Sequence, residues 1–361
     1  MTLVFTDIHF GLKLNTEVFL NIAQQNVEWI IKQVKENNVD NVIFCGDWFH
    51  QRSSVSVNTL HKSYESLKQL ASKVKNLYLI VGNHDSYYKN TIKVHSLKTF
   101  EQFDNVHIIE EPTMVNLQNK KALLVPWGVP TNELKQYSAD ITFGHFEPGG
   151  VRVHGQMMEN SECSPEDLTS ISPIVFSGHY HSYNNIKTNN GRRLIFVGSP
   201  SQQNWGDVDE QRGIIILDES KPNLDVRFIE NDIAPKFKKI SYSKLIDKSA
   251  NIKSTDIKNN FVKIIVDCQY KFDTVQQLII KLNKFEPLSV EAEYLYSEQI
   301  GAIISNSSGD NIKTHEDYIK EFIMEEGNTF PADINREKLL SLALSIYKKV
   351  QEKENDQPCN G

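Results

Sequence analysis

The stretch that decides the fold reads Leu77-Tyr78-Leu79-Ile80-Val81-Gly82-Asn83-His84-Asp85. Its first half is short, apolar and rich in β-forming residues, which is typical of a buried strand. Gly82 allows a sharp bend, and the next three residues supply an amide oxygen, an imidazole and a carboxylate. The polar residues would therefore lie at the carboxyl edge of the sheet, where the catalytic groups of α/β proteins are found. A plain Gly-Asn-Asp turn explains the pattern equally well, so it needs support from the rest of the chain.

Four further polar clusters follow strand-like runs in the same way. They are Thr6-Asp7-Ile8-His9, Gly46-Asp47-Trp48-Phe49-His50, Gly144-His145 and Gly178-His179-Tyr180-His181. Six of the eleven histidines fall in the five clusters, whereas independent accidents would scatter them. The other five we assign to surface or helix positions: His61, His95, His107, His154 and His315. The set as a whole therefore predicts one site.

The spacing of apolar residues predicts how the clusters are brought together. Residues 16–37 and 60–74 have the period of amphipathic helices and alternate with the strands at 3–5, 42–45 and 77–81. This βαβ order predicts a parallel-cored sheet. The runs at 106–109, 114–117 and 122–125 are expected to be strands of a second sheet, and 213–217 with 224–228 a closing hairpin.

Composition limits the class of protein. With 361 residues, of which 39% are hydrophobic, the chain is expected to form one large domain with appendages, or two domains. The net charge of −7 excludes a global attraction to nucleic acid or to an anionic membrane, so such binding would need a local basic surface or a partner.

Cysteine usage and hydropathy indicate the compartment. The four cysteines show no CxxC spacing: Cys45, Cys163, Cys268 and Cys359. We find no leader and no membrane-spanning stretch, so we expect a cytoplasmic protein with no membrane partner.

The residue types in the clusters indicate metal binding. In an extended segment Asp7 and His9 would leave the same side of the chain and grip one ion. The alternative is a strand-end Asp cap beside a surface His. Mixed oxygen and nitrogen ligands suit two hard-to-borderline divalent ions better than a structural zinc.

The order of the motifs resembles the signature of the calcineurin-like metallophosphoesterases. Within that superfamily, the motif Gly46-Asp47-Trp48-Phe49-His50, which ends in His, resembles that of the SbcD-type DNA repair nucleases, including their phage members. The resemblance implies an α/β fold, a two-sheet αββα sandwich with a small α+β capping domain and C-terminal helices. It implies one ion on Asp7, His9, Asp47 and His181 and a second on Asp47, Asn83, His145 and His179, with Mn²⁺ the first choice and Mg²⁺ the alternative.

The same resemblance implies catalytic roles for two non-ligand histidines. His84 would lie near the leaving oxygen as proton donor or charge stabiliser, and His50 would help to place the phosphate. Two ions roughly 3.5–4 Å apart would share a hydroxide that attacks the phosphorus. Asp85 would either orient the His84 imidazole or serve the turn alone.

The expected domains are a metallophosphoesterase (nuclease) domain at 1–230, the capping domain at 236–300 and a C-terminal helix-loop-helix at 313–353. By resemblance, the C-terminal helix-loop-helix would bind an SbcC-type ATPase, and the chain would form a homodimer. The resemblance also implies that the protein acts on DNA in recombination, repair or replication, and that it is phage-encoded and acts in a bacterial host. The alternatives are a scaffolding role for 236–300 and packing of the C-terminal helices on their own domain. The activity itself has two alternatives: a phosphodiesterase or phosphatase acting on small nucleotides or phosphoproteins, and a non-catalytic binding subunit.

Overall fold

The computed structural model describes residues 1–153, 155–158, 163–247, 249, 252–295, 319–320, 323–324 and 335–355, the last eight by their backbone alone. They belong to two compact units. The first comprises residues 1–266 and 270–293, and the second comprises 267–269 and 294–361.

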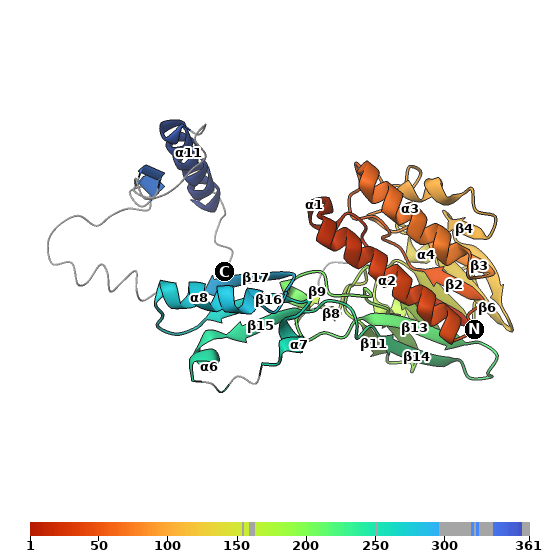
Figure 1. Cartoon of the computed structure of the whole chain (residues 1–361). Coiled ribbons are helices and arrows are strands. Elements are labelled where there is room, and N and C mark those ends of the chain that lie inside the picture. Colours follow the sequence, from red (N-terminus) through yellow and green to blue (C-terminus); the bar gives the residue numbers. More distant parts are fainter. Residues whose placement is uncertain are drawn as a thin grey trace. The chain divides into compact units, whose positions relative to one another are not determined.

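The first sheet carries three of the polar clusters at its carboxyl edge. The strand order is β14 (Asp225–Glu230), β13 (Gly213–Asp218), β1 (Thr2–Phe5), β2 (Asn41–Phe44), β3 (Asn76–Ile80) and β4 (Val106–Ile109). Strands β1 to β4 run parallel, and β13 pairs antiparallel with β1 and with β14. Figure 1 labels β2, β3, β4, β13 and β14 of this sheet. The closing hairpin is confirmed. Val106–Ile109, however, belongs to this sheet, so its assignment to the second sheet is wrong.

The second sheet carries the other two clusters. Its inner strands run parallel, and the two edge strands are antiparallel to their neighbours. The order is β11 (Asn184–Lys187), β12 (Arg193–Phe196), β10 (Ile174–Ser177), β7 (Ile141–Gly144), β6 (Lys120–Val125) and β5 (Thr113–Leu117).

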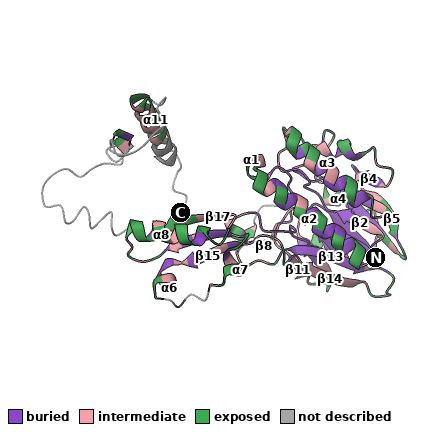
Figure 2. Cartoon of the chain, viewed as in Figure 1, coloured by how far each residue is buried: buried purple, intermediate pink, exposed green. Residues whose placement is uncertain are grey.

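Alternation along the strands builds the layers. In β1, Leu3 and Phe5 join the core beneath helices α2 (Glu17–Glu36) and α3 (Val57–Ala71), whereas Val4 joins the core between the two sheets. Figure 2 shows buried residues on these strands and exposed residues on the outer faces of both helices. The two amphipathic helices predicted from periodicity are therefore confirmed.

Short helices cover the other side of the second sheet. Leu134 of α4 (Thr131–Leu134) and Leu168 of α5 (Pro165–Ile171) are buried against strand residues such as Leu123. The first unit is therefore an α/β fold of two mixed sheets between helical layers, as predicted. Its minor elements are α1 (Leu12–Asn15), η1 (Ser96–Phe100), β8 (Val151–Val153), β9 (Gln156–Met158) and η2 (Trp205–Asp207).

A three-stranded sheet follows the two large ones. It consists of β15 (Phe237–Ser241), β16 (Phe261–Val266) and β17 (Ser289–Tyr294), with helices α6 (Tyr242–Ile246), α7 (Ser254–Ile257) and α8 (Phe272–Asn283). It contacts helix α2 through Phe261, whose ring centroid lies 5.3 Å from that of Phe19. The side-chain oxygen of Gln202 accepts a hydrogen bond of 2.7 Å from the Phe237 N–H. The role of this three-stranded sheet and its helices as a capping domain remains a prediction.

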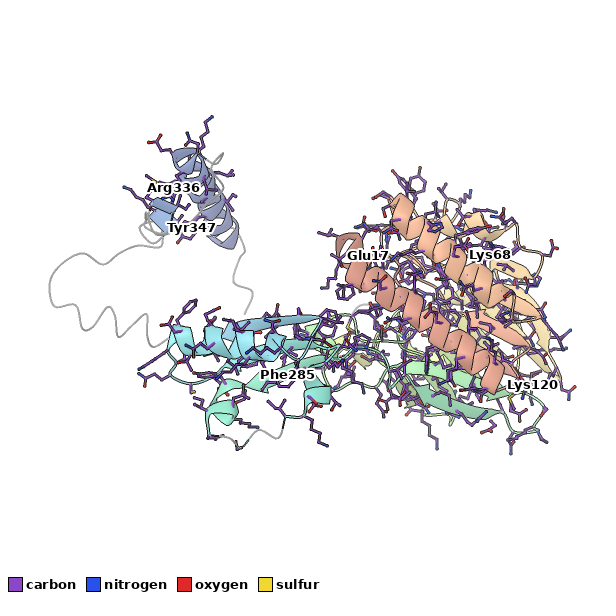
Figure 3. The ribbon with its side chains drawn as sticks, in the orientation of Figure 1. Glu17, Lys68, Lys120, Phe285, Arg336 and Tyr347 are labelled. Atoms are coloured by element: carbon purple, nitrogen blue, oxygen red, sulfur yellow. The ribbon has the colours of Figure 1, made fainter. Side chains whose placement is uncertain are left out.

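In the second unit the structure describes helix α11 (Arg336–Asn355), whose labelled side chains Arg336 and Tyr347 appear in Figure 3. Asn335 caps its start by accepting the Lys338 N–H at 3.1 Å. Leu342 and Ile346 are exposed. Most of the first helix expected within 313–353 lies outside the described residues. Among the residues described, we find no helix with the length and apolar character needed to cross a membrane.

Candidate metal centre

The loops after β1 and β2 bind each other and form the floor of the site. The N–H of Asp7 donates to the Gly46 carbonyl at 3.0 Å, and the N–H of His9 donates to the Asp47 carbonyl at 3.1 Å. The pairing continues at Phe10, whose N–H donates to the Trp48 carbonyl at 2.8 Å. This pairing sets the first two clusters side by side.

The backbone is not extended in these two loops or in the loop after β10. Asp7, His9, Asp47 and His179 have φ values of +54°, +52°, +66° and +81°, in the left-handed region that costs non-glycine residues roughly 1–2 kcal/mol. The expectation that Asp7 and His9 meet because they alternate along a strand is therefore wrong. They meet because β1 ends at Phe5 and the loop turns both side chains inward. Such strain is typical of functional sites.

Two glycines are required for different reasons. Gly46 has a φ of +100°, and a Cβ there would lie 2.4 Å from His145 Nδ1. At Gly82, where the sequence suggested a sharp bend, the need is close packing, because a Cβ would lie 2.3 Å from Asp47 Oδ1. Both glycines let β2, β3 and the His145 loop approach one another.

One group of donor atoms forms around Asp7. His9 Nε2 lies 3.1 Å from His181 Nε2, 3.6 Å from Asp7 Oδ1 and 3.7 Å from Asp47 Oδ2. His181 Nε2 is also 3.6 Å from Asp7 Oδ1. These are the four residues that the resemblance assigned to one ion.

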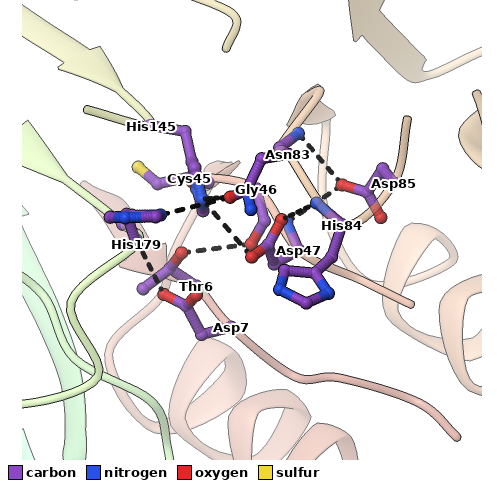
Figure 4. A network of polar contacts seen from close by, with 12 residues as sticks. Thr6, Asp7, Cys45, Gly46, Asp47, Asn83, His84, Asp85, His145 and His179 are labelled. Carbon is purple, nitrogen blue, oxygen red and sulfur yellow. Dashed lines mark hydrogen bonds and ion pairs between the residues drawn. The ribbon is translucent and has the colours of Figure 1, made fainter. Parts of the chain in front are cut away.

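A second group forms around Asn83 (Figure 4). The Asn83 Oδ1 atom lies 2.8 Å from His145 Nε2 and 3.2 Å from His179 Nδ1. His145 Nε2 is 3.4 Å from Asp47 Oδ2, the oxygen that also faces the first group. Asp47 therefore stands between the two groups, and each group contains the four residues assigned to it.

The donor set fits two divalent ions. Ligand atoms about 2.1 Å from one ion lie about 3–3.5 Å from each other, close to the separations in both groups. Asp7 Oδ1 is buried and has no hydrogen-bond partner among the described residues. His145 Nδ1 donates to the Cys45 carbonyl at 2.7 Å, so in the neutral ring the Nε2 lone pair faces two oxygens. Such convergent acceptors need a cation between them.

The pKa shifts in the centre also indicate a site for cations. Burial raises the pKa of Asp47, but the neighbouring imidazoles, His145 first, outweigh it and lower the pKa below its usual range. Burial lowers the pKa of His145, but the carboxylate of Asp47 outweighs it and raises the pKa to about 9. The centre therefore strongly attracts positive charge.

The two predicted catalytic histidines lie at the edge of the first group. His84 Nδ1 donates to the His50 carbonyl at 2.6 Å, and among the described residues Nε2 has no hydrogen-bond partner. The His50 and His84 rings are stacked with centroids 5.3 Å apart, and His50 Nδ1 is 3.4 Å from His9 Nδ1. Burial lowers the pKa of His84 and, together with the nearby His9, lowers that of His50 to about 4.

Asp85 supports the Asp47 loop. Its two carboxylate oxygens accept four backbone N–H groups, those of Asp47, Trp48, Phe49 and Gly82, at 2.9 to 3.1 Å. Burial and the nearby Asp47 raise the pKa of Asp85 to about 7, against the effect of these donors. Of the two roles considered from the sequence, the described contacts support the turn and loop role.

Three residues near the centre were missed. Trp127 follows β6 and stacks on the His179 ring at 5.3 Å, and Glu147 Oε1 lies 3.5 Å from His179 Nε2. Gln203 Nε2 donates to the Asp7 carbonyl at 2.8 Å. Trp127 had the signal of the other clusters, since it lies two residues after the end of a strand, whereas no local pattern marks Gln203.

The sequence prediction of surface or helix positions for the other five histidines is partly correct. His95 is buried, and its Nε2 lies 2.7 Å from Glu110 Oε1, so its assignment to a surface or helix position is wrong. His61 is exposed in α3, as predicted, whereas His107 lies in strand β4. His154 and His315 lie outside the described residues.

Comparison with known proteins identifies the class. The chain matches the family model of the calcineurin-like phosphoesterases over residues 1–183 and belongs to that family. Its members use a dinuclear metal centre, and the described residues contain candidate His and Asp clusters for it, among them Asp7 with His9 and His181, and Asp7 with Asp47 and His145. The chain is also similar to exonuclease subunit 1 of Enterobacteria phage T4, with 25% identity over 359 residues that cover 94% of this chain and 96% of the relative.

Solved structures show likeness of fold alone. Purple acid phosphatase PPD1 from yellow lupin (Lupinus luteus) has 13% identity and a TM-score of 0.43 over 65% of this chain and 52% of its own. GAP50, the anchor in the inner membrane complex of Plasmodium, has 15% identity and a TM-score of 0.40 over 64% of this chain and 85% of its own. Neither likeness carries an argument about activity.

Proposed function

We propose that the chain is the nuclease subunit of an SbcC-SbcD-type complex and hydrolyses DNA phosphodiesters with two divalent ions. The observation that carries the proposal is the pair of four-residue donor groups that share Asp47, with His84 at their edge. The similarity to a phage exonuclease subunit over almost the whole chain supports DNA as the substrate.

The proposal assigns each of the metal-binding residues to one or both ions. Asp7, His9, Asp47 and His181 would hold one ion, and Asp47, Asn83, His145 and His179 the other, with Mn²⁺ preferred over Mg²⁺. Bound there, two divalent ions supply a nucleophile at neutral pH and neutralise charge on the phosphate.

The chain's own groups orient the substrate and the ligands. The carbonyl of His50 accepts from His84 Nδ1 and fixes the ring, so that Nε2 can hydrogen-bond to the phosphate or leaving oxygen. The Cys45 carbonyl fixes His145, and Asp85 fixes the loop that carries Asp47. Each contact holds a donor atom in place before substrate arrives.

The partners follow from the same proposal. We expect the C-terminal helices within 313–353 to bind an SbcC-type ATPase, with the exposed Leu342 and Ile346 of α11 on the docking face, and we expect a homodimer inside the cell. With a net charge of −7, the isolated chain should bind DNA weakly, so the partner should recruit it.

A substrate panel tests the proposal. The purified chain would be incubated with Mn²⁺, Mg²⁺ or a chelator and given linear double-stranded DNA, a small phosphodiester and a phosphomonoester, with and without the ATPase partner and ATP. We expect metal-dependent cleavage of DNA that the partner enhances. Hydrolysis of small esters alone would contradict the nuclease and support an enzyme that acts on small nucleotides or phosphoproteins.

A further inference from the structure

A cavity of about 860 Å³ opens beside the metal centre. His145 forms part of its wall, and the rest includes Trp127, Phe146 and Lys89. This volume lies within the range of small-molecule sites, roughly 300–1,000 Å³. His145 is the one member of the two donor groups that lines this cavity, so the space is available to a part of the substrate other than the reacting phosphate.

Trp127 gives the cavity an aromatic wall in a fixed place. Its ring lies nearly parallel to that of His179, with centroids 5.3 Å apart at 28°, and edge-on to His145 at 5.8 Å. Its backbone N–H donates to the Val81 carbonyl at 2.9 Å. The indole is only half-buried, so the ring that rests on His179 also presents surface to the cavity.

The charge of the lining favours a neutral group. Among the described lining residues, Lys89 is the one lysine or arginine and Glu147 the one carboxylate, so the formal charges of these two cancel. A second phosphate would gain little here. The amides of Asn90 and Asn132 offer both donors and acceptors, which suits the edge of a heterocyclic ring.

We propose that this cavity binds an unpaired nucleobase adjacent to the cleaved phosphate, with the base stacked on Trp127. The inference rests on the proposed nuclease function and makes it more specific. A base that enters the cavity must leave the stack of the double helix, so the substrate is single-stranded or frayed at the point of cleavage. Stacking on an aromatic side chain tolerates any base, as a nuclease without sequence preference needs.

Two kinds of diester test the proposal in the full-length chain with Mn²⁺. Methyl p-nitrophenyl phosphate carries no base, whereas the thymidine 5′- and 3′-(p-nitrophenyl phosphates) carry one on either side of the phosphorus. Trp127→Ala should lower kcat/KM for the preferred thymidine ester, relative to the methyl ester, by roughly 5- to 150-fold. Trp127→Phe should restore most of this preference, and Phe272→Ala, at an exposed aromatic residue of α8, should not change it.

The ratio of kcat/KM for the thymidine ester to kcat/KM for the methyl ester separates the stacking effect from effects on the metal centre. Any disturbance that passes through His179 would change the hydrolysis of both kinds of ester alike. An equal loss on both would overturn the base site and leave the nuclease standing. If the wild-type chain hydrolysed neither kind of ester nor DNA, the proposed function itself would fall.

Discussion

Replacing Asp85 with asparagine should remove the main support of the Asp47 loop. The carboxylate is buried and accepts two N–H groups on each oxygen. Asparagine has the same shape but one acceptor oxygen, so two of the four N–H groups would face an NH₂ group. A hydrogen bond to a charged acceptor contributes about 1.5–3 kcal/mol, so the two losses should reduce the free energy of unfolding by roughly 3–6 kcal/mol.

Urea denaturation measures this loss. It should be done at pH 8, above the Asp85 pKa of about 7, and with a chelator so that bound metal does not contribute. Asp104→Asn is the matched control, because Asp104 is exposed in a turn and its replacement should change the free energy of unfolding by less than about 0.5 kcal/mol. A loss below about 1 kcal/mol in Asp85→Asn would refute the supporting role.

Three further predictions address chemistry, packing and assembly. His84→Ala should keep both metal ions and lose roughly 10²- to 10⁴-fold in hydrolysis, and near-normal rates would contradict its catalytic role. Trp48→Ala should reduce the free energy of unfolding by roughly 3–5 kcal/mol, because the ring is fully buried among Phe5, Phe44 and Phe100; a loss under about 1 kcal/mol in urea would contradict this. Deleting the residues after Ser307 should abolish co-purification with the ATPase partner but spare hydrolysis of a small diester, and an intact complex would refute the docking role.

The sequence predicted the features that depend on local pattern. Helices α2 and α3 followed from apolar spacing, and the polar clusters followed from the recurrence of Asp, Asn and His after strands. These features are local because a helix face or a strand end is encoded within a few residues. The grouping of the donor atoms around Asp47 also depends on the meeting of the strand ends and on the left-handed turns at Asp7, His9 and Asp47.

Other features depend on pairing across the chain and had no local signal. The strand Val106–Ile109 looks like its neighbours in sequence, but its sheet is decided by pairing with β3. The contact between Gln203 and the Asp7 carbonyl joins residues 196 positions apart. Three of the four N–H groups that Asp85 accepts come from residues 47–49, which are 36 to 38 positions away in sequence, and Figure 4 shows part of this network.

The metal content of the purified chain tests the account most directly, because the proposed catalytic roles depend on a dinuclear centre that shares Asp47. Elemental analysis after loading with Mn²⁺ and removal of free metal should find two ions per wild-type chain. Asp47→Ala should lose both, because the shared oxygen faces both donor groups. Two ions retained in Asp47→Ala would contradict the bridging role and, with it, the proposed centre.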